Sequence, residues 1–422
     1  MSQLKEKFLA EVMQFIKSKE AKQVVYKELN YHLKQSEQEL LSKGTDQSEA
    51  EKSAVQKMGS PSELGTRFNK LYRPLFDWKL FGLFLIVITM SLLPLVNIQE
   101  NYAENFMLKQ SCSIVLGIIT TIGIMLIDYR RIKNWSWLFL IVALVLLIAL
   151  SFFPNVVVNG QGYLHFASFT IAGEATFPLF LVFWAYFFSK EKPNLLLGFA
   201  VYFVSVLLFM KIPSIADVFI YSVLVLTLFV TSSIRKKTIY TTIGIAAGVV
   251  LTYVILFFTT MKEEQRNRLL VYLNPEKYAD SEGYQYVALK DLLHSGGWFG
   301  NEETPKFMVN MWTDFAFANI TYFFGWILAG ALIVQLTMLV IRLIMVSGKV
   351  KDIFGKQLII GVCALLSIQM IYNVGMIFGF LPLVSISLPF ISYGVTATVL
   401  NSLLIGIVLS VYRRKNLITE PS

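Results

Sequence analysis

The sequence has little charge, two cysteines and three histidines. Of its 422 residues, 37 are Lys or Arg and 28 are Asp or Glu, a charged share of 15%, whereas soluble domains carry about 25%. This scarcity excludes an ordinary soluble enzyme. Cys112 and Cys363 lie in apolar segments and the histidines are dispersed, so we expect neither a disulfide framework nor a cysteine or histidine metal site. A phosphate-binding Gly-Lys-Ser/Thr motif is also missing.

Apolar residues, in contrast, make up 55% of the chain, and the mean hydropathy is +0.59. Beyond Pro74 they fall into blocks of about 20 residues, the length of a helix that crosses a bilayer. We therefore expect an all-α, polytopic membrane protein with about ten transmembrane helices plus a small cytoplasmic helical domain. The ten blocks are residues 79–97, 110–127, 135–153, 174–189, 194–210, 213–232, 239–260, 316–341, 357–379 and 390–411.

Residues 1–73 differ in composition, with 13 Lys and Arg and 10 Asp and Glu. Apolar residues at helical spacing predict short amphipathic helices, interrupted at Gly44 and stopped at Pro61. The charged start does not fit a signal peptide. Resemblance to the small helical prefix domain ahead of some bacterial permeases and sensors rests on Glu28-Leu29, His32, Gly44, Ala50, Ala54-Val55, Met58-Gly59, Pro61 and Leu64. The resemblance implies a cytoplasmic regulator as partner, and a solubilising cap is the alternative.

Residues 74–422 are expected to form the ten-helix membrane domain. Basic residues gather in alternate loops, which the positive-inside rule places in the cytoplasm. They are Arg130, Arg131 and Lys133; Lys190 and Lys192; Arg235, Lys236 and Lys237; Arg342, Lys349, Lys351 and Lys356; and Arg413, Arg414 and Lys415. Both termini are then cytoplasmic, and the long loop 261–315 is external. The same rule explains the net charge of +9 without a nucleic-acid partner.

Three acids lie at the predicted outer ends of apolar blocks: Glu174, Asp217 and Asp314. Buried acids in membrane segments are costly and mark a cavity or pathway, although solvation at the membrane boundary is the alternative for each. Polar groups in and between the last two blocks are Gln369, Asn373, Ser385, Ser387 and Ser392. Hydrogen bonding between helices is their alternative role, and the favoured one for Asn373. Glycines and prolines between the ninth and tenth blocks indicate broken backbone, which needs a buried or water-lined setting.

The residues just described also carry a family resemblance. The stretch 381–394, preceded by Gln369 and Asn373, resembles the C-terminal signature of the SEDS (shape, elongation, division and sporulation) proteins RodA, FtsW and SpoVE. The large external loop of that family is similar, in order and spacing, to Arg266, Leu273-Asn274-Pro275, Gly283-Tyr284-Gln285, Gly296-Gly297-Trp298-Phe299-Gly300 and Thr313-Asp314-Phe315-Ala316-Phe317.

Membership would imply a peptidoglycan glycosyltransferase of the bacterial cytoplasmic membrane that polymerises lipid II at the outer face, paired with a class B penicillin-binding protein. It maps the catalytic carboxylate of the family onto Asp314. A carboxylate can accept the proton of the attacking sugar hydroxyl as general base. The bundle is then expected to contain a cavity open toward the outer leaflet.

The resemblance also suggests residues that bind substrate. The leaving diphosphate needs a cation, which is either Arg266 or a divalent metal, Mg²⁺ or Mn²⁺. Asn274 and Gln285 contact sugar or peptide, or only shape the loop. Glu174 is a candidate for a family Glu at the fourth crossing. Gln369 and Ser392 complete the predicted set.

Departures from the family pattern keep other functions open. Tyr322-Phe323 stands where a Glu pair is expected, and the segment 173–178 lacks the basic residue that follows the family Glu. Loss of the basic residue weakens diphosphate binding, and both departures favour a non-catalytic scaffold or regulator as the alternative. A transporter of lipid-linked substrates is a further alternative, because intramembrane acids and broken helices suit it.

Overall fold

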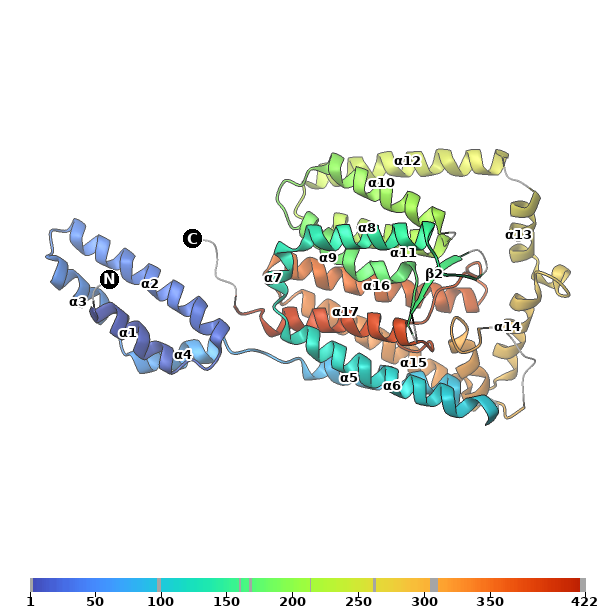
Figure 1. The fold of residues 1–422 in the computed structure, drawn as a ribbon, viewed down its shortest axis with the longest axis horizontal. Coiled ribbons are helices and arrows are strands. Elements are labelled where there is room, and N and C mark those ends of the chain that lie inside the picture. The colour runs from blue at the N-terminus through green and yellow to red at the C-terminus, as the bar shows by residue number, and fades with distance from the viewer. Residues whose placement is uncertain are drawn as a thin grey trace. The chain divides into compact units, whose positions relative to one another are not determined.

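The computed structural model describes residues 3–96, 100–158, 161–166, 169–212, 214–260, 263–303 and 310–417. They form two compact units, residues 3–77 with 412–417, and residues 78–411 (Figure 1). The expected all-α class is confirmed, since nearly every element in the described residues is a helix.

The N-terminal unit consists of four helices joined by short turns. Capping follows local sequence: Ser18 Oγ accepts from Ala21 N at 3.3 Å, and Asp46 Oδ2 accepts from Ser48 N at 3.2 Å. Proline at the first position of the last helix needs no donor there. The helices are α1 (Gln3–Gln14), α2 (Lys19–Ser42), α3 (Gln47–Met58) and α4 (Pro61–Leu71).

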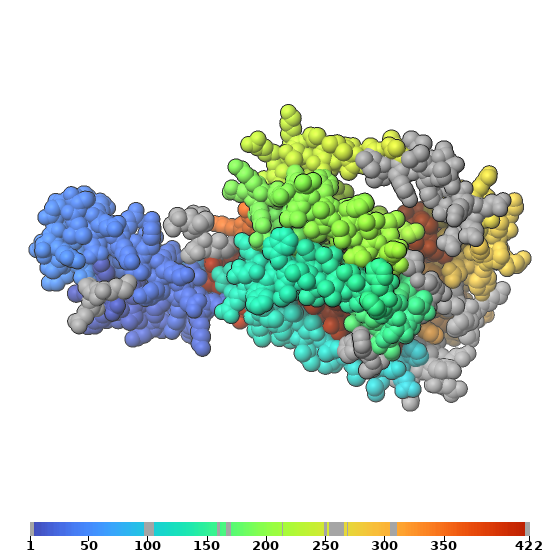
Figure 2. All heavy atoms as spheres, turned by 45° about the horizontal axis from the view of Figure 1, so that its top comes forward, coloured from blue at the N-terminus to red at the C-terminus, as the bar shows by residue number. Residues whose placement is uncertain are grey.

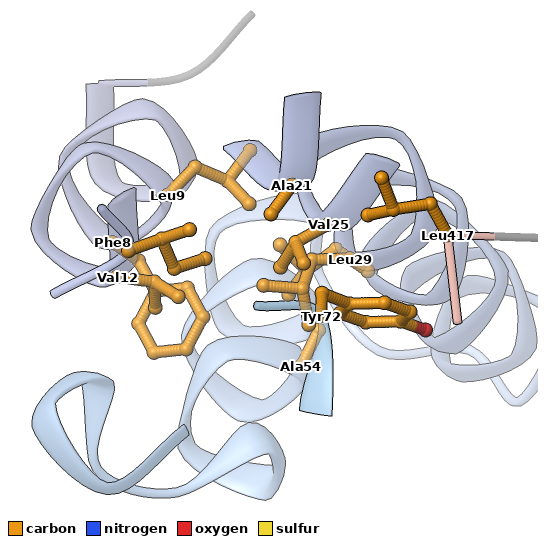
Figure 3. Packing of buried hydrophobic residues seen from close by; sticks show 11 residues of the cluster. Phe8, Leu9, Val12, Ala21, Val25, Leu29, Ala54, Tyr72 and Leu417 are labelled. Atoms are coloured by element: carbon orange, nitrogen blue, oxygen red, sulfur yellow. The ribbon is translucent and has the colours of Figure 1, made fainter. Parts of the chain in front are cut away.

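Residues from the other end of the chain complete the core of this unit (Figure 3). Leu417 is buried together with Leu29 and Tyr72. Nearby, the guanidinium of Arg414 is 2% exposed and donates to both carboxylate oxygens of Glu20, at 3.0 and 3.1 Å. The unit therefore extends beyond the expected boundary at residue 73 and takes in residues 412–417.

The membrane unit contains ten apolar helices within the described residues, one for each apolar block. They are α5 (Trp78–Thr89) continued by the 3₁₀ helix η1 (Met90–Leu95), α6 (Glu100–Leu126), α8 (Ser136–Phe152), α9 (Phe177–Phe188), α10 (Leu195–Lys211), α11 (Ile215–Val230), α12 (Lys236–Thr260), α15 (Ala316–Ser347), α16 (Ile353–Ile377) and α17 (Val395–Arg413). The short helix α7 (Tyr129–Asn134) links α6 to α8. By length and composition, α15, α16 and α17 are among the segments that could span a membrane alone.

A small antiparallel sheet between α8 and α9 was not predicted. Its strands are β1 (Val156–Val158), β2 (Gln161–Phe166) and β3 (Phe169–Ile171), in that order. Val157 pairs with Gly162, and His165 pairs with Thr170. The side chain of Asn155 fastens the end of the sheet by donating to the carbonyl of His165 at 2.8 Å.

The long loop between α12 and α15 is itself helical, with α13 (Glu263–Leu273), the 3₁₀ helix η3 (Pro275–Tyr278) and α14 (Tyr284–Ser295). Its side chains cover one end of the membrane unit, in yellow in Figure 2. The turn after α14 packs against a break in α15 at Gly325, where φ is +81° and a Cβ would lie 2.3 Å from Trp298 O. Glycine is therefore required at this position.

Candidate functional site

Asp314 lies in a tight turn directly before α15. The amides of Thr313 and Phe315 both donate to the carbonyl of Asn310, at 3.2 and 3.0 Å. Asn310 itself adopts a positive φ of 66°, a conformation that asparagine tolerates better than most residues. Asp314 is only 8% exposed in this turn.

Two side chains from distant segments hold Asp314. Ser385 Oγ donates to the carboxylate oxygen Oδ2 of Asp314 at 2.8 Å. From α16, Asn373 Nδ2 donates to the backbone carbonyls of Asp314 and Ile386, at 2.7 Å each. Asn373 therefore joins the Asp314 turn to the segment that carries Ser385, whereas sequence analysis favoured a bond between helices.

The irregular segment 378–394 is hydrogen-bonded to the same turn. Ser392 is 2% exposed, and its hydroxyl donates to the carbonyl of Thr313 at 2.7 Å and accepts from Leu388 N at 2.8 Å. The amide of Tyr393 donates to the carbonyl of Trp312 at 2.8 Å. These bonds join the two sequence signatures in space, since the segment 378–394 holds the turn that carries Asp314. The hydroxyl of Ser392 is occupied by backbone contacts, and its predicted role in binding substrate stays a prediction.

The setting of Asp314 alters its acidity. Burial raises the pKa of its carboxyl above the ordinary value, and the hydrogen bond from Ser385 acts in the opposite direction. A raised pKa makes the carboxylate a better proton acceptor, provided that the pH is high enough to ionise it.

Glu174 and Asp217 form a second acidic pair close to Asp314. Glu174 lies in the 3₁₀ helix η2 (Gly173–Thr176), and Asp217 lies in the first turn of α11. A Cβ on Gly173 would lie 2.3 Å from Asp217 Oδ2, so the glycine lets this carboxylate pack beside η2. Glu174 is within electrostatic range of both Asp217 and Asp314.

Sequence analysis missed Tyr163, on β2, as a neighbour of these acids. Burial raises the pKa of its hydroxyl, and the charges of Glu174, Asp217 and Asp314 raise it further. The hydroxyl donates to Gln161 Oε1 at 2.8 Å. No signal in the sequence pointed to Tyr163, because the sheet that presents it was not expected.

A narrow cavity brings together two of the predicted substrate-binding residues, Glu174 and Gln369, with Ser387 and Asn401 from neighbouring segments. Its volume is about 20 Å³, which is room for one water molecule. The expected wide cavity is therefore not found around Glu174 in the described residues. The side chains of α9, α16 and α17 fill the space there.

Arg266, Asn274 and Gln285 lie in the helical loop, on α13, between α13 and η3, and on α14. All three are exposed. In the described part of the chain, no hydrogen bond joins any of them to Asp314. The structure thus groups Glu174 and Gln369 but leaves these three apart from that group.

The residues present do not form a metal cage. Nowhere in the described ranges do three His, Cys, Asp or Glu side chains group closely enough to hold an ion. Glu174 and Asp217 offer two carboxylates, and Mg²⁺ usually completes such a site with water and substrate phosphates.

The sequence of this chain is similar to those of known proteins. The profile of the FtsW, RodA and SpoVE family, described as cell cycle proteins, matches residues 71–417. The chain belongs to this family. The probable peptidoglycan glycosyltransferase FtsW of Geobacter metallireducens is 27% identical over 73% of this chain and 85% of its own length. The peptidoglycan glycosyltransferase MrdB of Escherichia coli is 25% identical over 73% and 85%, and the stage V sporulation protein E of Bacillus subtilis is 26% identical over 71% and 84%.

Solved structures share the fold of this chain. A chain of a peptidoglycan synthase complex in which polymerization and crosslinking are coordinated aligns with a TM-score of 0.71 at 18% identity, covering 81% of this chain and 98% of that one. The rod shape-determining protein RodA of Thermus thermophilus aligns with a TM-score of 0.58 at 16% identity, over 81% and 97%. The described helices therefore form the fold of a bacterial membrane protein.

Proposed function

We propose that this protein is a peptidoglycan glycosyltransferase that polymerises lipid II at the outer face of the cytoplasmic membrane, in cell wall synthesis linked to shape, division or sporulation. The observation that carries the proposal is the buried Asp314 carboxylate, held by Ser385 and Asn373 from the signature segment. The names of the relatives that cover most of this chain support it.

Asp314 is the proposed general base. Ser385 occupies Oδ2, so among the described contacts Oδ1 is left to accept the proton of an incoming sugar hydroxyl. The hydroxyl oxygen attacks the anomeric carbon of the lipid-linked donor, a glycosidic bond forms, and the bond to the diphosphate breaks. The polyprenyl diphosphate leaves with the electron pair of the broken bond, and Asp314 releases the proton to water before the next cycle.

The leaving diphosphate requires a positive partner. Arg266 is exposed in the helical loop and is one proposed source of this charge. Mg²⁺ or Mn²⁺ brought with the diphosphate is the other, with Glu174 and Asp217 as the carboxylates that would hold the ion. Asn274, Gln285 and Gln369 remain proposed contacts to sugar or peptide.

We also propose that both termini lie in the cytoplasm and the helical loop outside. The charge pattern of the loops supports this orientation. Asp291→Cys, exposed on α14, is then labelled in intact cells by a membrane-impermeant maleimide in a cysteine-free background. Lys43→Cys, exposed in the N-terminal unit, is labelled only after permeabilisation. The reverse pattern would place Asp314 on the wrong side for lipid II polymerisation.

Partners follow from the same proposal. A class B penicillin-binding protein would crosslink the strands that this chain makes, as coordination of the two reactions in a related synthase complex suggests. A cytoplasmic regulator is the proposed ligand of the N-terminal unit.

The polymerase is tested with purified protein, its transpeptidase partner and lipid II. Asp314→Asn keeps the shape of the side chain and removes the base, so strand formation should fall by at least about 100-fold. Asp291→Asn is the matched control, because the same change is made on an exposed acid. Equal activity of Asp314→Asn and wild type would refute the assigned role of Asp314.

One observation favours a second candidate, a non-catalytic scaffold. Asp314 is 8% exposed and the cavity beside Glu174 admits only water in the structure described. Asp314 therefore presents little surface to a lipid-linked sugar. A scaffold predicts that Asp314→Asn supports growth as well as wild type, whereas deletion of residues 1–73 abolishes function.

A further inference from the structure

A second, much larger cavity lies under the helical loop. Its volume is about 550 Å³, within the range of about 300–1,000 Å³ typical of ligand sites. It lies between α13, η3 and α14 on one side and, on the other, the part of α15 just after the break at Gly325 and the end of α16. Six of the residues that line it have aromatic or basic side chains: Tyr272, Tyr286, Lys290, His294, Trp326 and Phe378.

Two pairs of aromatic rings line this cavity. The centroids of Tyr272 and Tyr286 are 6.1 Å apart, and those of Trp326 and Phe378 are 5.8 Å apart. Polar contacts fix the rings. Tyr272 donates its hydroxyl proton to the carbonyl of Phe380 at 2.8 Å, and Trp326 Nε1 donates to the carbonyl of Leu293 at 3.2 Å. Rigid rings bind at a low entropic cost.

Polar groups stand at the rim above an apolar floor. Lys290 and His294 are exposed, whereas Leu289 and Met376 are buried. The chain 263–303 carries eight acidic residues against four basic ones, and Lys290 pairs with Glu276 at 2.7 Å. An anionic ligand is disfavoured by this charge. Rings combined with hydroxyl and imidazole groups suit an uncharged ligand that has apolar faces and hydroxyl edges, as a sugar ring does.

The cavity is connected to the Asp314 site. The hydroxyl of Tyr286 accepts from the amide of Leu383 at 3.0 Å. Leu383 precedes by two residues Ser385, the side chain that holds the carboxylate of Asp314. A ligand against Tyr286 therefore contacts a side chain that is hydrogen-bonded to the short segment that positions the proposed base.

We propose that this cavity is a saccharide subsite that binds uncharged N-acetylhexosamine units of the glycan strand, with Tyr272, Tyr286 and Trp326 as stacking platforms. The assignment rests on the proposed polymerase function and specifies where that enzyme holds the strand. Lys290 and His294 donate hydrogen bonds to sugar hydroxyl or acetamido oxygens at the rim.

The test is binding of a β-1,4-linked N-acetylglucosamine tetramer to the full chain in detergent, measured by calorimetry and by tryptophan fluorescence. Tyr272→Phe and Tyr272→Ala both lose the bond to Phe380, but only the second loses the ring. We expect Tyr272→Phe to bind like wild type and Tyr272→Ala to bind about tenfold more weakly. Trp326→Phe should remove most of the fluorescence change, and Trp298→Phe, outside the cavity lining, should not.

The outcomes separate this proposal from the polymerase itself. Asp314→Asn should bind the tetramer as tightly as wild type, because binding requires no chemistry. Failure of the wild-type chain to bind, or equal binding by Tyr272→Ala, would overturn the subsite even if polymerisation depends on Asp314. Saturable binding of the uncharged isoprenoid farnesol that Tyr272→Ala weakens, without binding of the tetramer, would show a lipid site instead.

Discussion

The two units of the chain bury polar side chains to different extents, and Arg414 is one of the few that are buried in the N-terminal unit. The N-terminal unit has an apolar core, exemplified by Leu9, Val12 and Val25, each fully buried. The membrane unit also buries polar groups such as Asn373 and Ser392, which hydrogen-bond across segments far apart in the sequence. In lipid, apolar side chains gain little by turning inward, so packing and polar contacts specify how helices meet. The family match begins at residue 71, so this polar network belongs to the shared part.

Replacement of Asn373 should have the largest effect on activity and stability, because this side chain belongs to the buried polar network of the membrane unit. Asn373→Ala leaves the carbonyls of Asp314 and Ile386 without their donor, which costs about 1–3 kcal/mol for each buried group. It also releases the turn of the proposed base. We expect polymerisation to fall at least about tenfold and the membrane unit to unfold at a lower temperature.

Asn319→Ala is the matched control, because Asn319 is buried in α15 and donates to the carbonyl of Pro94 at 3.4 Å. It should lower stability but leave activity much closer to wild type. Equal losses of activity in both variants would mean that Asn373 contributes packing and no specific positioning.

Removal of the Leu417 side chain tests the N-terminal unit. Leu417 is 2% exposed in its core, so Leu417→Ala should destabilise that unit by about 2 kcal/mol or more. Hydrogen exchange of α2 in the full chain measures the effect. Leu41→Ala, at a position 41% exposed, should change exchange far less. If the two variants behave alike, the C-terminal residues do not contribute to this core.

Loss of the contact between Glu20 and Arg414 should have the next largest effect on the stability of the N-terminal unit. A charge-assisted pair of hydrogen bonds contributes about 1.5–3 kcal/mol, and Glu20→Gln removes the negative charge from this pair. In a double-mutant cycle with Arg414→Gln, the coupling energy should be about 1 kcal/mol or more. Additive effects of the two substitutions would show that the contact does not stabilise the unit.

Loss of the helix cap at Asp46 should have the smallest effect on stability. Asp46→Ala removes the acceptor for Ser48 N at the start of α3 and should cost about 1 kcal/mol. Asp46→Asn keeps a capping oxygen and should cost much less. Thermal unfolding of the full chain distinguishes the two variants. Equal melting temperatures would show that the capping bond of Asp46 does not stabilise α3.

The helices could be predicted from the sequence because their signals are local. Apolar runs of spanning length marked the ten helices of the membrane unit. In the N-terminal unit Gly44 marked the break between α2 and α3, whereas Pro61, which was predicted to stop the helices, begins α4. The strands around Tyr163 could not be predicted, since β1 and β3 have three residues each and no long alternating pattern.

Contacts across long stretches of sequence were the least predictable. Nothing near Asn373 indicates that its amide reaches Asp314, 59 residues away. Arg414 was interpreted as a topological charge, because a basic residue after a membrane span has that role most often. Its pairing with Glu20, 394 residues away, depends on the folded N-terminal unit. The resemblance to a family identified Asp314, and only the structure identified what holds it.

The pH dependence of polymerisation tests the central claim most directly. A general base must be ionised, so the rate should rise with pH through a pKa that burial has raised above that of an ordinary Asp. The bond from Ser385 lowers the pKa of Asp314, so Ser385→Ala should move this limb of the profile of kcat/KM to higher pH. An unchanged limb in Ser385→Ala, or a profile of wild type without any acidic limb, would contradict Asp314 as the base.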